Sequence, residues 1–249
     1  MGIGQATAVL FGREGANVVV ADINEEEGKA TAKQIKDEGN EAIFVHVDVT
    51  KEDLVKRMAE MTATTYGGID VLIANAGTFA LGKIHELSNE EWDRIMNIDL
   101  KGAFWCCKHV IPYMLKRGKG SIVVTSSVNA LVAEPELGVY CAAKAAMCGL
   151  VRAIALDYGP NNIRANALLP GTIDTPMNIE YFNAQRDPVL ARREIEAIHV
   201  LGRLGTPMEM AYCMVFLASD ESSFVTASCM VADGGMTAII NPAPAFKVS

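Results

Sequence analysis

Residues 1–24 of the 249-residue chain read MGIGQATAVLFGREGANVVVADIN. Two glycines, Gly2 and Gly4, open an amphipathic run, and a continuously apolar, β-branched segment then ends at Asp22. A continuously apolar segment of this kind is typical of a buried strand in a parallel sheet. The stretch therefore predicts the second half of a nucleotide-binding unit, and the sequence begins inside its phosphate loop.

Strand-like and helix-like segments alternate along the rest of the chain. Segments that begin with polar capping residues are expected to be helices, the caps being Asn24, Thr50, Ser88 with Glu91, and Thr206 before Pro207. This alternation predicts an α/β fold, a parallel sheet covered by helices on both faces. The expected strands are at 16–22, 41–49, 69–77, 120–127, 162–171 and 228–235, and the expected helices are at 24–39, 50–67, 88–118, 138–160, 178–198 and 206–219.

No linker, repeat or low-complexity segment divides the chain, so residues 1–249 are predicted to form a single domain. Its short Pro-rich tail, 239–249, either packs on a neighbouring subunit or stays loose.

Composition and charge exclude several classes of function. Hydrophobic residues make up 50% of the chain and charged residues 21%, which is a globular balance. The net charge of −8, with no basic run, disfavours nucleic acid and anionic membranes as partners. No signal peptide is recognisable, and no apolar run approaches the ~20 residues of a membrane span. The cysteines lack zinc-ligand spacing and the histidines are scattered, so we expect free thiols, no metal site and a cytoplasmic location.

The sharpest local signal is YCAAK, residues 140–144. Tyr140 and Lys144 are four positions apart on a predicted helix, so their side chains leave one face a turn apart. A free tyrosine has a pKa of about 10, but a nearby ammonium group favours its phenolate form. The pair therefore predicts a general acid/base that works near neutral pH. Alone, the motif also fits an ordinary amphipathic helix.

Ser127 stands thirteen positions before Tyr140, at the end of the predicted strand GSIVVTSS. In a doubly wound sheet, ligands bind at the carboxyl ends of the strands. A hydroxyl at this place could donate a hydrogen bond to a carbonyl oxygen. The alternative is a loop serine that caps a turn.

Six motifs occur in one order along the chain: GIGQA (2–6), ANAG (74–77), Ser127, YCAAK, PGTIDT (170–175) and VADGG (231–235). Together they resemble the signature of the short-chain dehydrogenase/reductase family, and the resemblance extends to about Ala238. It implies a single Rossmann-type domain with a doubly wound parallel sheet. It also implies reversible hydride transfer between a nicotinamide cofactor and a small-molecule alcohol or ketone.

The resemblance also implies roles for individual residues. Tyr140 would exchange a proton with the substrate oxygen, Lys144 would hold the nicotinamide ribose and favour the phenolate, and Ser127 would orient the substrate oxygen. Residues 178–198 would form a mobile lid. The other expected cofactor contacts are Gly2, Ile3, Gly4, Asp48, Val49, Asn75, Ala76, Gly77, Pro170, Gly171, Ile173 and Thr175.

Asp22 favours NAD over NADP. It closes the predicted strand 16–22, where the adenosine ribose of a dinucleotide would lie. A carboxylate there accepts hydrogen bonds from the ribose hydroxyls of NAD and repels the 2′-phosphate of NADP. The residues that follow, Ile23 and Asn24, offer no basic partner for a phosphate. The alternative is that Asp22 only caps the next helix.

The chain departs from the family pattern at Asp99, in MNIDLKGAF, where the family usually has Asn. That Asn anchors a water that links the lysine to solvent in a proton relay. Asn97 cannot substitute for it, because two helical positions correspond to a rotation of about 200°. Asp99 can still accept from a water, and its charge would keep Lys144 protonated. We therefore expect an active relay with Asp99 as the fourth catalytic residue.

The second departure is at the start of the chain. The family's loop is Thr-Gly-x-x-x-Gly-x-Gly after a strand, whereas only Gly2 and Gly4 are present here, and Thr7 rules out GxGxxG. The first strand, apparently missing, would lie between segments 16–22 and 69–77. Leaving it out would orphan buried backbone groups at ~1 kcal/mol or more each. We therefore expect roughly 10–15 further residues upstream in the natural protein, the length of a strand and the front of a loop.

Two other functions stay open. A non-catalytic family member that binds nucleotide or a protein partner would fit the shortened loop, although Ser127, Tyr140 and Lys144 together favour an enzyme. A 3-oxoacyl-carrier-protein reductase would normally use NADPH, and Asp22 and the lack of a basic surface run count against it.

The expected substrate pocket suits a mid-sized hydroxy or keto compound with an apolar part, such as a cyclic alcohol, steroid or polyol. The apolar helix faces around Trp105 and Tyr140 predict an oligomer, with a homotetramer as first choice and a dimer as second. The expected pocket residues are Val128, Asn129, Glu134, Leu137, Met177, Tyr181 and Phe182.

Overall fold

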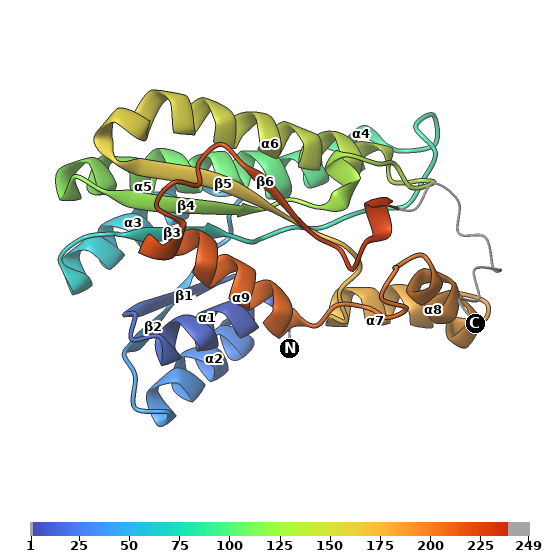
Figure 1. Ribbon diagram of the computed structural model, residues 1–249, viewed down its shortest axis with the longest axis horizontal. Coiled ribbons are helices and arrows are strands. Elements are labelled where there is room, and N and C mark those ends of the chain that lie inside the picture. Colours follow the sequence, from blue (N-terminus) through green and yellow to red (C-terminus); the bar gives the residue numbers. More distant parts are fainter. Residues whose placement is uncertain (1, 239–249) are drawn as a thin grey trace.

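The computed structural model describes residues 2–238, and each strand pair in this part of the chain is parallel (Figure 1). The strands form two sheets, and all of them fall within segments predicted as strands. One sheet pairs β1 (Val18–Asp22) with β2 (Ala42–His46). The other has the order β3 (Val71–Ala74), β4 (Gly120–Thr125), β5 (Ile163–Pro170) and β6 (Cys229–Ala232). The Pro-rich tail, 239–249, lies outside the described residues.

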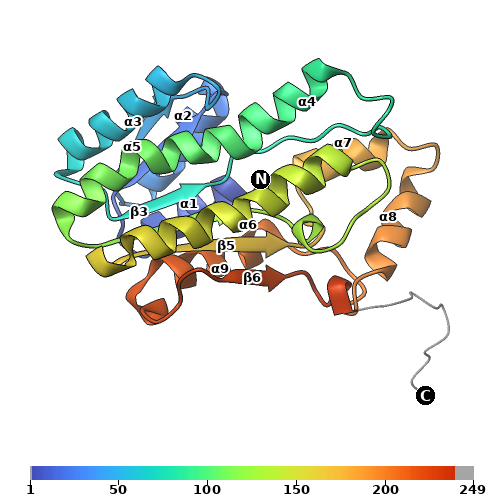
Figure 2. The ribbon, with the colours of Figure 1, turned by 90° about the horizontal axis from the view of Figure 1, so that it is seen from above.

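Helices cover both faces of the sheets, as predicted (Figures 1 and 2). In β4, Ile122 and Val124 pack into the core beneath α3, α5 and α6, whereas Val123 packs on the other side against α9. Burial on both faces explains why this strand is apolar without interruption. The helices are α1 (Ile3–Arg13), α2 (Glu25–Asp37), α3 (Glu52–Tyr66), α5 (Gly102–Arg117), α6 (Gly138–Tyr158) and α9 (Pro207–Ala218).

The sheet is interrupted between β1 and β3. The family pattern has a strand at this place that was not found in the sequence. Within the described residues, β1 pairs with β2 alone and β3 pairs with β4 alone, so no strand lies between β1 and β3. Residues of both strands line the space between them. Helix packing bridges the interruption, because Ala6 and Leu10 of α1 cluster with Ala211 of α9.

The predicted caps at Asn24, Ser88 and Thr206 are confirmed, since each side chain accepts a hydrogen bond from a backbone N–H in the first helical turn. The predicted cap at Thr50 is wrong, because α3 begins two residues later. The Thr50 hydroxyl instead donates to Asp48 Oδ1 at 2.7 Å, which ties it into the turn before the helix.

The segment 88–118 is helical, as predicted (Figure 2), but it contains a π-helical turn. Helix α4 (Asn89–Ile95) leads into the π turn Met96–Lys101, and this turn leads into α5. A π turn changes the direction of the side chains that follow and is frequent at functional sites. Here Asp99 lies in the turn with its side chain fully buried. Hydrophobic periodicity alone did not predict this turn.

The predicted lid segment, 178–198, is largely helical. It comprises most of α7 (Pro176–Asn183) and all of α8 (Pro188–Ala197), which lie together at one end of the molecule (Figure 2). Short 3₁₀ turns complete the described elements, at Val128–Ala130, Gly159–Asn161, Asp220–Ser222 and Met236–Ala238.

Helix α6 with the turn after it, Gly138–Asn161, is long and apolar enough to cross a membrane by length and composition, contrary to the expectation from the sequence. In the fold, this helix contributes Met147 and Val151 to the main core, both fully buried against the sheet. Core helices of this kind pass the same test, so the finding is weak evidence for a membrane span.

Candidate active site

A cavity of about 1870 Å³ runs along the carboxyl ends of the strands and into the space between β1 and β3. Every residue predicted above to take part in catalysis or cofactor binding lines it, except Asp99, which lies behind its wall. The expected substrate-pocket residues line it as well. The fold therefore brings the predicted residues to one cavity, although they come from almost the whole length of the chain.

Tyr140 and Lys144 lie one turn apart on α6, with Lys144 Nζ 5.3 Å from the centre of the Tyr140 ring. The Lys144 ammonium group is buried; it pairs with Asp99 Oδ2 at 3.0 Å and donates to the carbonyl of Thr125 at 3.1 Å. Burial opposes the charge on Lys144, but its electrostatic interactions with Tyr140 and Asp99 and its bond to the Asp99 carboxylate outweigh burial, so the pKa of Lys144 is raised. The helix thus holds an ammonium group next to the tyrosine.

Asp99 contacts Lys144 directly, whereas a water-mediated link was expected. Its second oxygen, Oδ1, accepts a hydrogen bond from the backbone N–H of Thr78 at 2.8 Å. Burial raises the pKa of Asp99, and the neighbouring Lys144 opposes this shift. Gly77 leaves room for the pair, since a Cβ there would lie 3.2 Å from both Asp99 Oδ2 and Lys144 Nζ.

Ser127 starts a chain of hydrogen bonds. Its hydroxyl accepts from the backbone N–H of Asn129 at 3.1 Å and donates to Asn129 Oδ1 at 3.0 Å. Asn129 Nδ2 in turn donates to Glu134 Oε1 at 3.1 Å. Ser127 therefore caps the 3₁₀ turn that follows it, the alternative considered above, and also lines the cavity.

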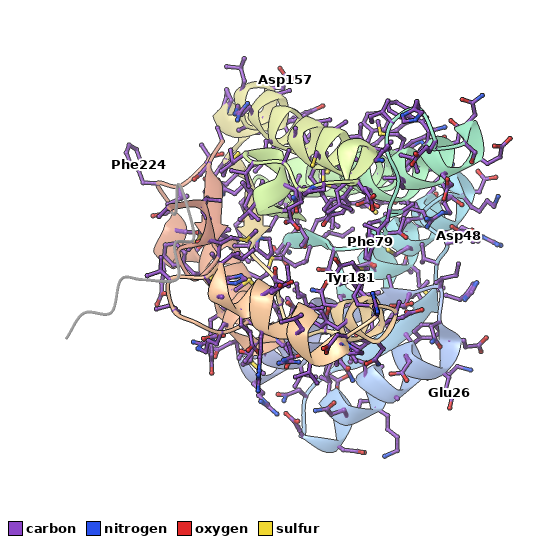
Figure 3. The ribbon with its side chains drawn as sticks, turned by 90° about the vertical axis from the view of Figure 1, so that its right-hand side faces the viewer. Glu26, Asp48, Phe79, Asp157, Tyr181 and Phe224 are labelled. Atoms are coloured by element: carbon purple, nitrogen blue, oxygen red, sulfur yellow. The ribbon has the colours of Figure 1, made fainter. Side chains whose placement is uncertain are left out.

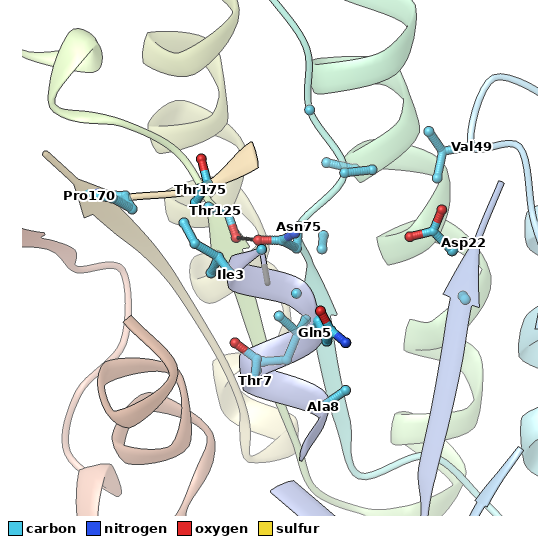
Figure 4. Close-up of a pocket in the computed structure, with 18 of the residues that line it drawn as sticks. Ile3, Gln5, Thr7, Ala8, Asp22, Val49, Asn75, Thr125, Pro170 and Thr175 are labelled. Carbon is cyan, nitrogen blue, oxygen red and sulfur yellow. Dashed lines mark hydrogen bonds between the residues drawn. The ribbon is translucent and has the colours of Figure 1, made fainter. Parts of the chain in front are cut away.

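The N-terminus of α1 faces the cavity beside the end of β3 (Figure 4). Gly2 occupies the N-cap position without a side-chain cap, so the first backbone N–H groups have no side-chain partner there. A Cβ at Gly4 would lie 2.9 Å from Asn75 Nδ2, so this glycine allows the helix to approach β3 closely. Asn75 Oδ1 accepts from the Thr125 hydroxyl at 3.0 Å, which ties the ends of β3 and β4 together.

Asp22 is exposed at the end of β1, on the opposite side of this opening (Figure 4). Its Oδ1 accepts from the backbone N–H of Asn24 at 2.8 Å, and Asn24 is the cap of α2. Thr175 also caps a helix, because its hydroxyl accepts from the N–H of Asn178 at the start of α7. Both residues line the cavity, so a local structural role accompanies any role toward a ligand.

The six cysteines have free thiols, three of them buried. Burial raises the pKa of Cys106 and of Cys107 to about 12, which keeps both thiols protonated. Residues 2–238 contain no group of three or more His, Cys, Asp or Glu side chains that could hold a metal ion.

A family model described as enoyl-(acyl carrier protein) reductase matches residues 1–237. The fold is also that of a crystal structure assigned to the short-chain dehydrogenase/reductases, from Burkholderia xenovorans. The TM-score is 0.93 at 32% identity, and the match covers 96% of this chain and 92% of that one.

The chain belongs to the short-chain dehydrogenase/reductase family.

Relatives of this short-chain dehydrogenase/reductase include enzymes named for cyclic alcohols. A 2,5-dichloro-2,5-cyclohexadiene-1,4-diol dehydrogenase of Sphingobium indicum is 42% identical over 96% of this chain and 94% of its own length. A cyclopentanol dehydrogenase of Comamonas testosteroni is 39% identical, again over 96% and 94%. A 3-oxoacyl-[acyl-carrier-protein] reductase of Thermotoga maritima is 38% identical over 94% and 93%. The protein is therefore an oxidoreductase of the alcohol dehydrogenase type that uses a nicotinamide cofactor and a small-molecule alcohol.

Sequence reasoning missed three residues of this dehydrogenase site: Thr78, Phe79 and Thr125. Phe79 lies on the loop after β3, with its ring centre 6.4 Å from those of Tyr140 and Tyr181; Figure 3 labels Phe79 and Tyr181. No periodic pattern marks such a loop, although its place at the end of a parallel strand was a usable signal. Thr78 and Thr125 contact Asp99 and Lys144 through backbone groups, which side-chain motifs do not reveal.

Proposed function

We propose that this protein interconverts a cyclic secondary alcohol and its ketone with NAD(H), with Tyr140 as the general acid/base. The observation that carries the proposal is the arrangement of Tyr140 and Ser127 on one cavity wall, with the buried Lys144–Asp99 ion pair behind them. The relatives named for cyclic alcohols support this substrate class.

The residues around the cavity fit a nicotinamide dinucleotide. The N-terminus of α1 offers backbone N–H groups and the positive end of a helix dipole to a diphosphate. Gly4 allows close packing on Asn75, and Asp48, Val49 and Asp22 line the far side of the same opening. When bound, the cofactor supplies the hydride acceptor or donor.

NAD is the proposed form because of the charges in the cavity wall. Asp22 lies where a 2′-phosphate would need a basic partner, and it is the acceptor that ribose hydroxyls need. Among the described residues that line the cavity, Lys144 is the only lysine, arginine or histidine, and its charge is already paired with Asp99. A 2′-phosphate would therefore stand among carboxylates.

In the proposed reaction, the Tyr140 oxygen takes the hydroxyl proton when an alcohol is oxidised and returns it when a ketone is reduced. When substrate binds, Ser127 redirects its O–H from Asn129 Oδ1 to the substrate oxygen, where it supports the negative charge that develops, and it still accepts from the Asn129 N–H. The Lys144 ammonium group favours the tyrosinate, and Asp99 keeps this ammonium group charged and in place. Phe79 and Tyr181 hold the apolar part of the substrate.

A carrier-protein reductase is the second candidate, since a relative carries that name. The carboxylates of the cavity wall would repel the 2′-phosphate of NADPH and the phosphate of a carrier arm, so they disfavour this candidate. A non-catalytic binding role does not account for the buried Lys144–Asp99 pair beside Tyr140. A homotetramer, a dimer as second choice, a mobile lid at 178–198 and a cytoplasmic location remain predictions.

Thermal unfolding with NAD, with NADP and without cofactor, followed by turnover of cyclic alcohols, tests the proposal. A ligand at 100 times its dissociation constant stabilises the folded state by about 2.7 kcal/mol. We expect a rise in Tm with NAD and a much smaller one with NADP, and formation of reduced cofactor with a secondary cyclic alcohol. Equal shifts would overturn the preference for NAD. Cofactor binding without turnover of any alcohol or ketone would favour the non-catalytic alternative.

A further inference from the structure

The wall of the cavity is acidic on the substrate side as well as on the cofactor side. Glu134 and Glu136 lie on the loop that leads from the 3₁₀ turn Val128–Ala130 into α6, close in sequence to Tyr140, and both line the cavity. No unpaired basic side chain of the described lining faces them, because Lys144 is bound to Asp99. An anionic group on a substrate would therefore be repelled here, whereas a hydrogen-bond donor would be attracted.

Glu134 is held in place by the hydrogen-bond chain that begins at Ser127. Its Oε1 accepts from Asn129 Nδ2 at 3.1 Å, and no other side chain of residues 2–238 hydrogen-bonds to this carboxylate. Asn129 is buried, and its own Oδ1 accepts from the Ser127 hydroxyl at 3.0 Å. Because a carboxylate only accepts, Asn129 must direct its NH₂ group to Glu134 and its carbonyl to Ser127. The second oxygen of Glu134 remains available to a ligand.

Aromatic side chains line the space between Glu134 and the pair Tyr140 and Ser127. The Phe79 ring meets the rings of Tyr140 and Tyr181 edge to face, each at 6.4 Å between centres. Figure 3 shows Phe79 and Tyr181 near each other. Leu137 and Met177 extend the apolar lining. A substrate that fills this space has an apolar body, a reacting oxygen at Tyr140 and Ser127, and a second contact at Glu134, two hydrogen bonds away from Ser127.

We propose that Glu134 is a specificity-determining residue that accepts a hydrogen bond from a second hydroxyl group of the substrate. The protein then prefers a neutral cyclic diol to the matching mono-alcohol and discriminates against a hydroxy acid. This inference rests on the proposed function, because it assigns a substrate class to the same site. Charge-assisted hydrogen bonds are stronger than neutral ones, which gives the carboxylate its advantage over an amide at this position.

The test compares kcat/KM of the full chain with NAD for four matched substrates: cyclohexanol, cyclohexane-1,4-diol, 4-hydroxycyclohexanecarboxylate and 4-aminocyclohexanol. We expect the diol to exceed cyclohexanol by about tenfold and the hydroxy acid to be the poorest substrate. Equal values for the diol and cyclohexanol would overturn the inference. A clear preference for the amino alcohol over the diol would do so as well, because the carboxylate would then be an ammonium site.

The variant Glu134→Gln keeps an oxygen for Asn129 Nδ2 and so leaves the bonds to Ser127 in place. We expect kcat/KM for the diol to fall about tenfold, that for the hydroxy acid to rise about threefold, and that for cyclohexanol to stay within about twofold. The control is Glu136→Gln, which removes the same charge from the same loop without touching Asn129. A uniform loss on all substrates in Glu134→Gln would show a structural role only and would overturn the inference.

A binding measurement separates this inference from the proposed function. Calorimetric titration of the cofactor complex with the diol and with cyclohexanol requires no turnover. Tighter binding of the diol that is lost in Glu134→Gln would support Glu134 even if no alcohol were oxidised, an outcome that would refute the proposed reaction alone. Equal affinity for the two ligands in the wild-type protein would refute the role of Glu134 and leave the proposed reaction intact.

Discussion

Asp99 Oδ2 lies 3.0 Å from Lys144 Nζ, and both side chains are almost completely withdrawn from solvent, at 0% and 4% exposure. The two residues are far apart in the sequence, and the π turn Met96–Lys101 brings the carboxylate inward to meet α6. In the low dielectric of the interior, each charge depends on the other. The ion pair therefore couples the fold to the proposed acid/base group.

The variant Asp99→Ala is expected to lower the free energy of unfolding by about 3–5 kcal/mol, because it leaves the Lys144 ammonium group buried without its anion. Asp99→Asn removes the same negative charge but keeps an acceptor for the Thr78 N–H, so its loss should be smaller than that of Asp99→Ala by about 1–2 kcal/mol. Urea unfolding at neutral pH measures both. Equal stability of Asp99→Ala and the wild-type protein would show that the ion pair contributes nothing to stability.

Removal of one oxygen atom tests the proposed role of Tyr140. The variant Tyr140→Phe keeps the ring that packs against Phe79, so folding and cofactor binding should be retained. We expect kcat to fall by about 10²–10⁴, the usual contribution of a general acid/base. Turnover of a cyclic alcohol gives the loss, and the Tm shift with NAD reports on the cofactor site.

The matched control for this variant is Tyr158→Phe, at the other end of α6 and packed against the main core. It should lose little or no activity. If Tyr140→Phe retained more than about a tenth of the wild-type kcat, another group would have to move the proton.

Much of the fold could be predicted from the sequence because its signals are local. A strand buried on both faces is apolar throughout, and a helix start carries its own capping residue, as at Asn24 and Ser88. The failed cap at Thr50 shows the limit of this reasoning. The Thr50 hydroxyl donates to Asp48 and is not used as a helix cap. Where two polar residues lie close together in a turn, the sequence does not show which hydrogen bonds each of them makes.

For the candidate site, the sequence predicts which side chains lie together where a regular repeat places them, but not where tertiary geometry places them. Tyr140 and Lys144 are related by the repeat of a helix, so their proximity follows from spacing alone. The direct contact of Asp99 with Lys144 depends on a π turn that hydrophobic periodicity does not encode. Phe79 lies on a loop, where position is set by the tertiary fold and not by any repeat.

Replacement of Asp22 should change the cofactor preference. In Asp22→Ser, the ribose hydroxyls lose a charged acceptor and a 2′-phosphate loses its nearest repulsive charge, so the NAD dissociation constant should rise by about tenfold or more. The difference in Tm shift between NAD and NADP should shrink accordingly. Glu14→Gln, another exposed carboxylate of the cavity lining, serves as the control and should leave the preference unchanged. If Asp22→Ser kept the preference for NAD over NADP, the only role left for Asp22 would be to accept the hydrogen bond from the Asn24 N–H in the turn.

Glu209 should make the start of α9 sensitive to acid. The carboxylate accepts from Arg203 at 2.6 and 3.0 Å and from the backbone N–H of Thr206 at 2.7 Å, and these bonds lower the pKa of Glu209 to about 2. Since the folded-state pKa lies below the unfolded value of about 4.3, the stabilisation is complete above that value and is lost as the pH falls toward 2. At neutral pH, Glu209→Gln should be less stable by about 1 kcal/mol, the usual size of a helix cap.

Urea unfolding of both proteins from neutral pH down to the lowest pH at which they still unfold cooperatively checks this prediction. The stability curves of the wild-type protein and Glu209→Gln should run parallel at neutral pH and converge below about pH 4, because protonation then removes the charge that the variant lacks. Lys33→Gln serves as the control, since it neutralises one partner of an exposed i,i+4 pair with Asp37 and should alter stability by less than about 0.5 kcal/mol. A gap between the two curves that did not depend on pH would show that the Glu209 amide and carboxylate differ only in packing, and the ionic part of the cap would be refuted.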